Sequence, residues 1–213
     1  MPNNQYAFND DLRRSIAHNL TRFEHRTIED ETLRRAAVVV VVAKGETNDS
    51  ATMILTYRPG GMRRHAHQYA LPGGRSDEGE TTIQTALREL HEELRVELDP
   101  ADVLGFLDDY PTMSGFAITP IVAWANADLE IDPDPVEVEK VFRIPFSELD
   151  STAIPHLTEE KNGEPPVLFS RFPTLGHRMY APTAAMVYQF REVAIRGLDT
   201  RVAHYGQPEF AWK

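Results

Sequence analysis

The stretch from Leu71 to Val96, LPGGRSDEGETTIQTALRELHEELRV, constrains the fold of this chain more than any other. It joins a Pro-Gly-Gly turn to a segment whose apolar residues recur at helical spacing from about Thr82. These residues form one narrow stripe that other parts of the chain must cover: Ile83, Ala86, Leu87, Leu90 and Leu94. We therefore expect a helix that packs by this stripe on a scaffold of strands.

The opposite side of the predicted helix carries Arg88 and three glutamates. Glu89 and Glu93 are four residues apart and Glu92 follows Glu89 by three, so the spacing predicts that the carboxylates converge on one point. Two such charges about 4 Å apart repel by about 1 kcal/mol in water, and one arginine offsets only part of this repulsion. A divalent cation would offset the rest, and carboxylate oxygens suit magnesium or manganese. The alternative is the solvated face of an ordinary surface helix.

Strand-like segments flank this stretch on both sides. The valine-rich run 36–43 is typical of a strand buried on both faces, and 52–58 is predicted to pair with it across the turn sequence GETNDS. Residues 103–110, 116–125 and 136–144 are predicted to return to the sheet. A proline inside the second of these indicates an edge strand or a bulge.

The two ends of the chain are predicted to be helical. Residues 8–26 have an amphipathic pattern that Asn9 or Asp10 can cap, and residues 180–197 have a second one with Pro182 in its first turn. The proline- and glycine-punctuated segment 155–178 is predicted to be a long irregular connection. The simplest interpretation is one α/β domain over residues 1–213, with its core at 36–150.

Charge and composition exclude several classes of protein. The net charge of −11 argues against a uniform nucleic-acid-binding surface, which needs a basic footprint. The longest apolar run is far too short to cross a membrane, and the N-terminus has no apolar signal region. With no cysteine, the chain is expected in the reducing cytoplasm. A local basic cluster could still bind a small phosphate ester: Arg58, Arg63, Arg64, His65 and Arg75.

The central stretch resembles the Nudix hydrolase signature G-x5-E-x7-R-E-U-x-E-E-x-G-U, in which U is a bulky aliphatic residue. The matching positions are Gly74, Glu80, Arg88, Glu89, Leu90, Glu92, Glu93 and Val96. Arg95 stands where the family has the glycine that ends the helix, which puts the local loop geometry in doubt. The resemblance implies a Nudix-type α/β/α sandwich with a mixed central sheet and additional terminal helices, and a Nudix box at 74–96.

The resemblance also implies roles for individual residues. Glu92 and Glu93 are implied metal ligands, and Glu89 is a further ligand or the base that takes a proton from water. The implied role of Arg88 is to orient the carboxylates, with Glu80 beside it as a structural partner. The remaining candidates are the Gly73 carbonyl as a metal ligand, and either Glu137 or Glu139 as a later loop glutamate. We favour Glu137, and the alternative for both is an exposed charge at a strand edge.

A second resemblance concerns the sequence before the box. The coenzyme A diphosphatase subgroup carries a pattern close to L-L-T-x-R-S-x-x-L-R-x-H-x-G-x-V-x-F-P-G-G-x-x-D, and this chain has ILTYRPGGMRRHAHQYALPGGRSD. His67 replaces a glycine of that pattern, where it could fill space that the substrate needs. Arginine forks match phosphate oxygens, so the implied substrate-binding residues are Arg58, Arg63, His65 and Arg75. The alternatives are that the arginines only balance the acidic site and that His65 is a structural hydrogen-bonding residue.

These resemblances imply a magnesium- or manganese-dependent hydrolase that splits coenzyme A or its thioesters into 3′,5′-ADP and (acyl-)phosphopantetheine. A Nudix hydrolase of another nucleoside diphosphate derivative is the first alternative, for example of ADP-ribose, NADH, a dinucleoside polyphosphate or a nucleoside triphosphate. A non-catalytic ligand-binding regulator is the second. The expected partner is a small nucleoside diphosphate, with no nucleic acid and no membrane. Because many family members dimerise, a homodimer is also expected.

Overall fold

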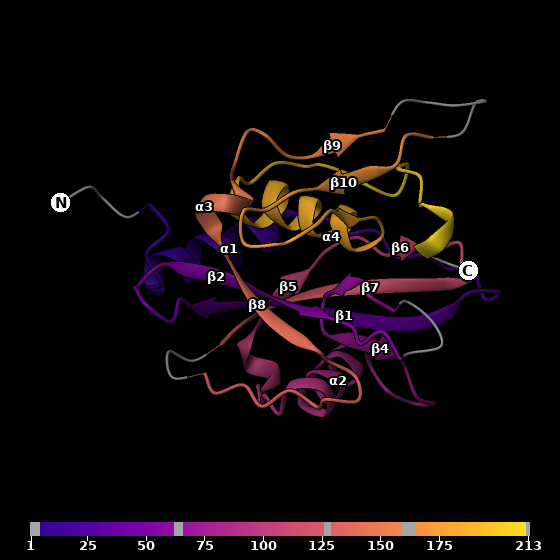
Figure 1. The fold of residues 1–213 in the computed structure, drawn as a ribbon, viewed down its shortest axis with the longest axis horizontal. Helices are drawn as coiled ribbons and strands as arrows, with labels where there is room; N and C mark the ends of the chain where they lie inside the picture. Colours follow the sequence, from indigo (N-terminus) through magenta and orange to yellow (C-terminus); the bar gives the residue numbers. More distant parts are fainter. Residues whose placement is uncertain (1–4, 62–65, 126–128, 159–164, 212–213) are drawn as a thin grey trace.

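A computed structural model describes residues 5–61, 66–125, 129–158 and 165–211 of the chain. Its centre is a mixed sheet of eight strands (Figure 1). These are β1 (Arg34–Lys44), β2 (Ala51–Tyr57), β3 (Tyr69–Ala70), β4 (Gly73–Arg75), β5 (Val103–Phe106), β6 (Tyr110–Pro111), β7 (Phe116–Trp124) and β8 (Lys140–Pro145). The order is β3-β2-β1-β7-β5, with β4 beside β1, β6 beside β7 and β8 beside β2. β1 and β7 are parallel, whereas β1 and β2 are antiparallel.

Helices cover both faces of this sheet, as the α/β/α prediction requires (Figure 1). They are α1 (Asp10–Arg22), α2 (Thr82–Leu94), α3 (Phe146–Leu149) and α4 (Thr183–Phe190), and α4 runs on into a wider helical turn, Arg191–Ile195. One face carries α2, and the other carries α1, α3 and α4. A second sheet lies beyond α4 and consists of β9 (His156–Leu157), β10 (Leu168–Ser170) and β11 (Met179–Tyr180).

The prediction that the valine run forms a strand buried on both faces is confirmed. Val38, Val40 and Val42 join the core cluster beneath α1 and α4, while Val39 and Val41 join the cluster against α2. Because successive side chains of a strand point to opposite faces, an uninterrupted apolar run fills two cores at once. β1 is therefore the shared wall between the two layers of helices.

Capping contacts show where α1 and α2 begin. The Asn9 side chain accepts a hydrogen bond from the Leu12 amide at the start of α1. Thr81 caps α2, and its side chain and that of Gln84 form a reciprocal capping box. Such a box satisfies backbone donors that the first turn of a helix leaves unpaired, so it fixes where α2 begins.

Three expectations about the remaining segments need correction. Of the two alternatives for Pro120, the edge strand is wrong, because β7 lies between β1 and β5. The pairing of β5 with β7 does shift register, between Val103 and Gly105, but the proline itself stands opposite the break between β5 and β6, where the Leu107 amide donates to the Pro120 carbonyl. For the same reason residues 103–110 form two short strands rather than one. Segment 155–178 is not wholly irregular, since β9 and β10 lie within it.

In the part of the chain that the structure describes, no helix has both the length and the apolar character that crossing a bilayer requires.

Candidate active site

Helix α2 is held against the sheet by the predicted apolar stripe. Ala86, Leu90 and Leu94 are fully buried in the cluster that contains Val39 and Val41 of β1. Ile83 and Leu87 complete the stripe and are partly buried. The carboxylate-bearing side of the helix therefore has a fixed orientation relative to the turn that precedes it.

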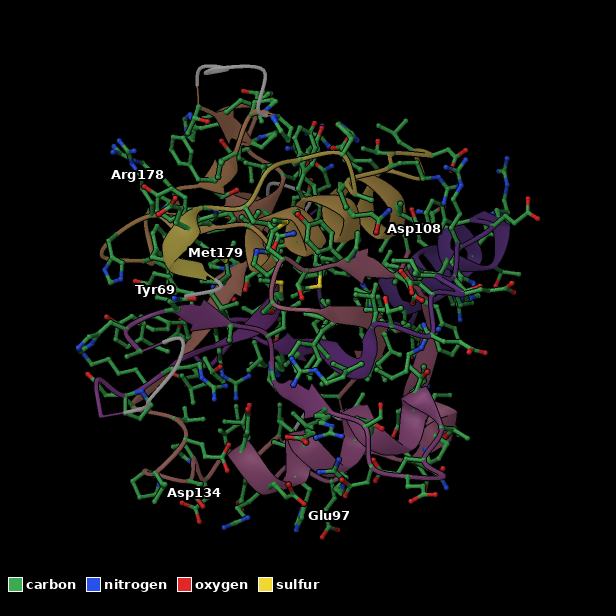
Figure 2. The ribbon with its side chains drawn as sticks, turned by 90° about the vertical axis from the view of Figure 1, so that its right-hand side faces the viewer. Tyr69, Glu97, Asp108, Asp134, Arg178 and Met179 are labelled. Carbon is green, nitrogen blue, oxygen red and sulfur yellow. The ribbon has the colours of Figure 1, made fainter. Side chains whose placement is uncertain are left out.

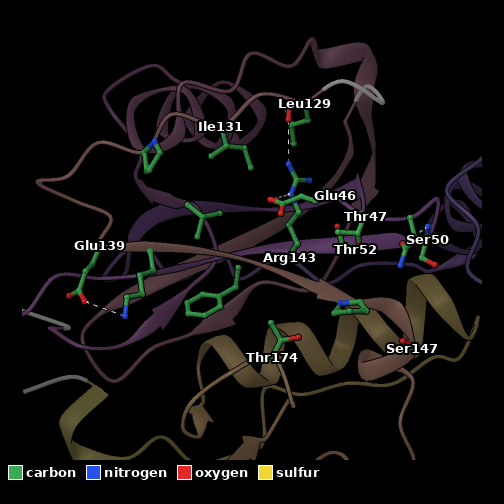
Figure 3. A pocket seen from close by; sticks show the side chains of 17 residues that line it. Glu46, Thr47, Ser50, Thr52, Leu129, Ile131, Glu139, Arg143, Ser147 and Thr174 are labelled. Atoms are coloured by element: carbon green, nitrogen blue, oxygen red, sulfur yellow. Dashed lines mark hydrogen bonds and ion pairs between the residues drawn. The ribbon is translucent and has the colours of Figure 1, made fainter.

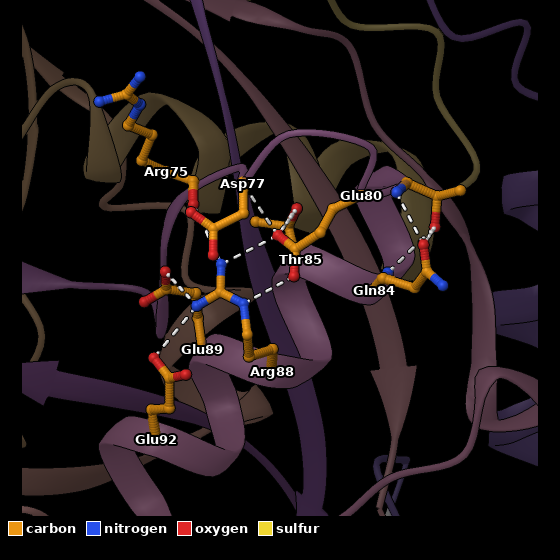
Figure 4. A network of polar contacts seen from close by, with 9 residues as sticks. Arg75, Asp77, Glu80, Gln84, Thr85, Arg88, Glu89 and Glu92 are labelled. Carbon is orange, nitrogen blue, oxygen red and sulfur yellow. Dashed lines mark hydrogen bonds and ion pairs between the residues drawn. The ribbon is translucent and has the colours of Figure 1, made fainter.

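Arg88 is the centre of a polar network on this helix (Figure 4). Its guanidinium donates from Nε to Glu80 Oε1 at 2.7 Å and from Nη2 to Glu80 Oε2 at 3.0 Å. Its Nη1 atom donates to Glu89 Oε1 at 2.9 Å and to Glu92 Oε2 at 3.1 Å. One arginine thus orients three carboxylates at once, and it stands beside Glu80 as predicted.

The Glu80 carboxylate is strongly stabilised in its ionised form. The hydrogen bond from Arg88 is the main reason that the pKa of Glu80 is lowered to about 2, and the Asp77 amide adds to it. The Thr85 hydroxyl, which is fully buried, donates to Glu80 Oε2 at 2.9 Å. This contact was not predicted, since no sequence pattern pairs a threonine with a glutamate in the preceding loop.

Glu93 does not lie on the exposed side of the helix as predicted. It is 1% exposed and faces Arg58 of the segment after β2, with Arg58 Nη1 3.7 Å from Glu93 Oε1. Burial is the main cause that raises the pKa of Glu93 to about 8, while the Arg58 charge and the Gly73 backbone act to lower it. Within the described structure, Glu93 Oε2 and Arg58 Nε are buried without a hydrogen-bond partner.

Glu89 packs its carboxyl group against the Gly-Gly turn. A Cβ atom added to Gly74 would lie 2.5 Å from the carboxyl carbon and both oxygens of Glu89, so only glycine leaves room for this group. Gly73, at φ 149°, packs equally closely against the backbone of β1, where a Cβ would lie 2.3 Å from the Ala37 carbonyl. The turn thus brings main-chain atoms close to two of the predicted ligands.

A fourth glutamate reaches the same region from the loop before β8. Glu137 raises the pKa of both Glu89 and Glu93 by charge repulsion, in each case after the larger effect of burial. Glu139, the other candidate, instead lies beside Tyr57 and pairs with Lys140 at 4.0 Å. The preference for Glu137 therefore agrees with where the two side chains lie.

The donor set of these glutamates suits a hard divalent cation. Four carboxylates share one region, and the unpartnered Glu93 Oε2 atom is an oxygen of the kind that such a cation binds. The predicted convergence of Glu89, Glu92 and Glu93 on one point is not found, however. Within the residues described, no group of three or more such side chains is close enough to hold a metal ion. Glu89 and Glu92 turn toward Arg88, and Glu93 turns toward Arg58, because each carboxylate lies beside a guanidinium group.

The predicted substrate-binding residues are not all gathered here. Arg58 lies at the cluster. Arg75 contributes its backbone carbonyl to Arg88 Nη2 at 3.1 Å, while its exposed guanidinium points away from the glutamates in Figure 4. Arg63 and His65 lie outside the described residues.

Two departures from the family patterns share one backbone conformation. His67 and Arg95, which stand in place of glycines, both have φ 57°, and no other non-glycine residue among those described has positive φ. Arg95 ends α2 and donates from Nη1 to the Glu92 carbonyl at 2.9 Å, while its Nη2 atom lies 3.5 Å from Asp134. The His67 ring packs over Gly60 and lies 6.1 Å from the ring of Tyr57. At both positions the backbone therefore has the left-handed conformation that glycine commonly adopts.

A separate hollow of about 890 Å³ runs along β8 (Figure 3). Its arginine, Arg143, already binds the carbonyls of Lys44 and Leu129 and lies 3.3 Å from Glu46. Of the candidate residues it contains Glu139 but none of the glutamates of α2. The hollow therefore does not belong to the carboxylate cluster.

Comparison with known proteins gives a consistent result. Residues 32–167 match the NUDIX domain. A protein from Pectobacterium atrosepticum called uncharacterized Nudix hydrolase NudL is 37% identical over 116 residues, which cover 54% of this chain and 59% of that protein. A protein of the same name from Photorhabdus laumondii is 29% identical over 181 residues, or 84% of this chain and 86% of that protein. The first match thus spans less than two thirds of its relative.

Among solved structures, a MutT/nudix family protein from Enterococcus faecalis has a similar fold. The TM-score is 0.50 at 17% sequence identity, and the alignment covers 78% of this chain and 64% of the other. At this identity the similarity concerns the fold alone.

Proposed function

The chain belongs to the NUDIX domain family, and on that premise we propose that it hydrolyses the diphosphate linkage of coenzyme A or its thioesters. The products would be 3′,5′-ADP and (acyl-)phosphopantetheine. The observation that carries this proposal is the position of Arg58. It matches the arginine of the coenzyme A diphosphatase pattern and lies 3.7 Å from Glu93 of the Nudix box.

The proposed cofactor is magnesium or manganese, which when bound offsets the negative charge of the diphosphate. Glu89, Glu92 and Glu93 are the side chains proposed to hold it, together with the Gly73 carbonyl. Support comes from the oxygen-only donor set and from the buried Glu93 Oε2 atom, which has no hydrogen-bond partner within the described structure. Such hard ligands are the ones these two cations prefer.

The residues of this chain have distinct proposed tasks around the diphosphate. Arg88 fixes the orientation of Glu89 and Glu92, because its guanidinium is itself held by the two hydrogen bonds that it donates to Glu80. Arg58 provides positive charge next to Glu93 and can donate to a phosphate oxygen from its guanidinium edge. These arrangements position groups in advance of the substrate.

A water molecule must lose a proton as it attacks phosphorus, and two glutamates are candidates to accept it. Glu89 is half-buried, and burial is the first cause that raises its pKa, which makes its carboxylate a better proton acceptor. Glu137 lies on the loop whose Asp134 amide bonds to the Glu93 carbonyl at 2.9 Å, so it is held near the same cluster. We propose Glu89 or Glu137 as the base.

A panel of substrates tests the proposal. Purified protein with magnesium or manganese is offered coenzyme A, acetyl-coenzyme A, ADP-ribose, NADH, diadenosine tetraphosphate and nucleoside triphosphates, and products are separated chromatographically. We expect turnover of coenzyme A and its thioester. Turnover of ADP-ribose alone would show that the substrate is a nucleoside diphosphate derivative other than coenzyme A. Tight binding of one compound with no turnover of any would indicate a regulator.

A further inference from the structure

Two adjoining hollows lie on the face of the sheet that is remote from α2. One, of about 220 Å³, lies between β3 and the segment around β11, and it is closed by Phe210 near the C-terminus. The other, of about 740 Å³, lies along residues 171–180. They share His177, Arg178 and Tyr180, so we treat them as one aromatic–basic pocket. Figure 2 shows Tyr69 and Arg178 on the same side of the molecule.

Aromatic rings form the walls of this pocket. The His177 ring lies 4.8 Å from that of Tyr69 at an interplanar angle of 34°, and Tyr180 meets Phe210 edge-on at 5.2 Å. Polar contacts fix these walls. The Tyr69 hydroxyl accepts from the Gly176 amide at 3.2 Å, and the Gln68 side chain donates to the Phe210 carbonyl at 3.0 Å. The pocket is therefore assembled from three parts of the chain that are far apart in sequence.

The charge of the pocket is opposite to that of the whole chain. Its described lining contains Arg171, Arg178, His67 and His177 but no aspartate or glutamate, although the net charge of the chain is −11. The guanidinium of Arg178 lies 4.6 Å from the centre of the Phe169 ring and 3.5 Å from the Tyr180 hydroxyl. Its contacts among the described residues thus leave its positive charge without a carboxylate.

The pocket and the carboxylate cluster are neighbours across the sheet. Tyr57 and Arg58 are consecutive, and their side chains point to opposite faces. The Tyr57 ring lies 5.4 Å from that of His177, whereas Arg58 faces Glu93. A ligand long enough to extend from Tyr57 to Arg58 around the end of β2 would reach both places.

We propose that the aromatic–basic pocket binds a phosphorylated nucleoside. A flat base would stack on the rings, and a phosphate would pair with the arginine forks. The nucleoside is either the 3′-phosphorylated end of the substrate itself, which rests on the proposed function, or a separate free nucleotide.

The test measures binding without turnover. Adenosine 3′,5′-bisphosphate and unphosphorylated adenosine are titrated calorimetrically into the full-length protein in the presence of a chelator. We expect the bisphosphate to bind more tightly. Loss of one arginine–phosphate contact should weaken its binding about 10- to 100-fold in Arg178→Ala. His177→Ala should weaken the binding of both the bisphosphate and adenosine, because it removes a ring on which the base stacks. The control is Arg14→Ala, since Arg14 is exposed on α1 and pairs with Asp11.

Further measurements locate the ligand and separate the two sources. An 8-azido derivative of the bisphosphate should label peptides that contain residues 67–69 or 177–180. If the substrate's own end binds here, Arg178→Ala raises KM for coenzyme A and the bisphosphate inhibits competitively. If a separate nucleotide binds, KM stays unchanged and binding persists beside substrate. If the protein binds the bisphosphate but does not hydrolyse coenzyme A, the proposed pocket is supported and only the proposed function is overturned. Unchanged affinity in both pocket variants, or labelling elsewhere, overturns the pocket.

Discussion

Arg58 Nη1 lies 3.7 Å from Glu93 Oε1, and the two side chains are 19% and 2% exposed. The pair joins the segment after β2 to the helix that carries the other glutamates. Removing the cation from a buried ion pair leaves an uncompensated buried charge, which is costly. The state of Glu93 therefore depends on a residue outside the Nudix box.

The first prediction concerns pH. Burial raises the pKa of Glu93 from 4.5 to about 8, so between these values the folded protein retains a proton that the unfolded chain has lost. The free energy of unfolding should then fall as pH rises through that window. Urea unfolding in chelator at several pH values measures this, and Glu93→Gln should flatten the dependence. If the free energy of unfolding depends equally on pH in the original protein and in Glu93→Gln, the raised pKa of Glu93 is contradicted.

The second prediction concerns Glu92, whose side chain is half exposed and held by Arg88. Glu92→Gln should lower turnover by roughly two orders of magnitude or more, because it removes a proposed ligand charge. Its stability should change by no more than about 0.5 kcal/mol, as is usual for surface positions. The matched control is Glu97→Gln, since the Glu97 side chain is 87% exposed and lies 3.9 Å from His91. Near-normal turnover in Glu92→Gln would show that the metal site is misplaced.

The third prediction concerns the space beside Glu89. In Gly74→Ala the new methyl group would lie 2.5 Å from the Glu89 carboxyl group, which must move. Displacement of a catalytic group by about 1 Å can lower turnover about 100-fold. Gly61→Ala is the control, because a Cβ there meets no atom of the described residues within 4 Å. Turnover and circular dichroism should be measured together, and equal activity in both variants would exclude the effect.

The fourth prediction concerns the end of α2. Arg95 has φ 57°, and a left-handed backbone costs a residue with a side chain about 1 kcal/mol more than glycine. Arg95→Gly should therefore be about 1 kcal/mol more stable than Arg95→Ala, since both lose the bonds to the Glu92 carbonyl and Asp134. Denaturant midpoints measure the difference. Equal midpoints would mean that this turn is not strained.

The sequence was most informative where one periodicity dominates. The valine run and the apolar stripe of α2 predicted the central strand and its covering helix, because burial on fixed faces leaves one arrangement. It was least informative for β9 and β10. These strands are two and three residues long, which is too short for an alternating pattern to be recognised.

The candidate site stays a prediction, and the structure agrees with only part of the arrangement expected for it. Helical spacing placed Arg88 correctly beside Glu92. It placed Glu93 on the wrong side, because the carboxylate is buried facing Arg58 of the segment after β2, a contact that spacing within one helix does not reveal. Ligand roles, the dimer and the cytoplasmic location stay predictions, and so do the roles of Arg63 and His65.

The doubts raised by the two replaced glycines have a common answer. At both His67 and Arg95 a side chain adopts the backbone angle for which glycine is usually needed. Sequence comparison registers only the changed letter, whereas the dihedral angle is what the turn requires. A missing motif glycine is therefore weaker evidence against a function than it first looks.

Tyr57 ends β2 and Arg58 follows it, with side chains on opposite faces, so one peptide unit divides the aromatic–basic pocket from the glutamates. A slip of this strand by a single position would send the arginine among the rings and the tyrosine toward Glu93. The register of β2 therefore decides which of the two side chains faces the glutamates. A molecule folded with β2 shifted by one residue against β8 would be compact, but Tyr57 and Arg58 would each face the site that the other now faces.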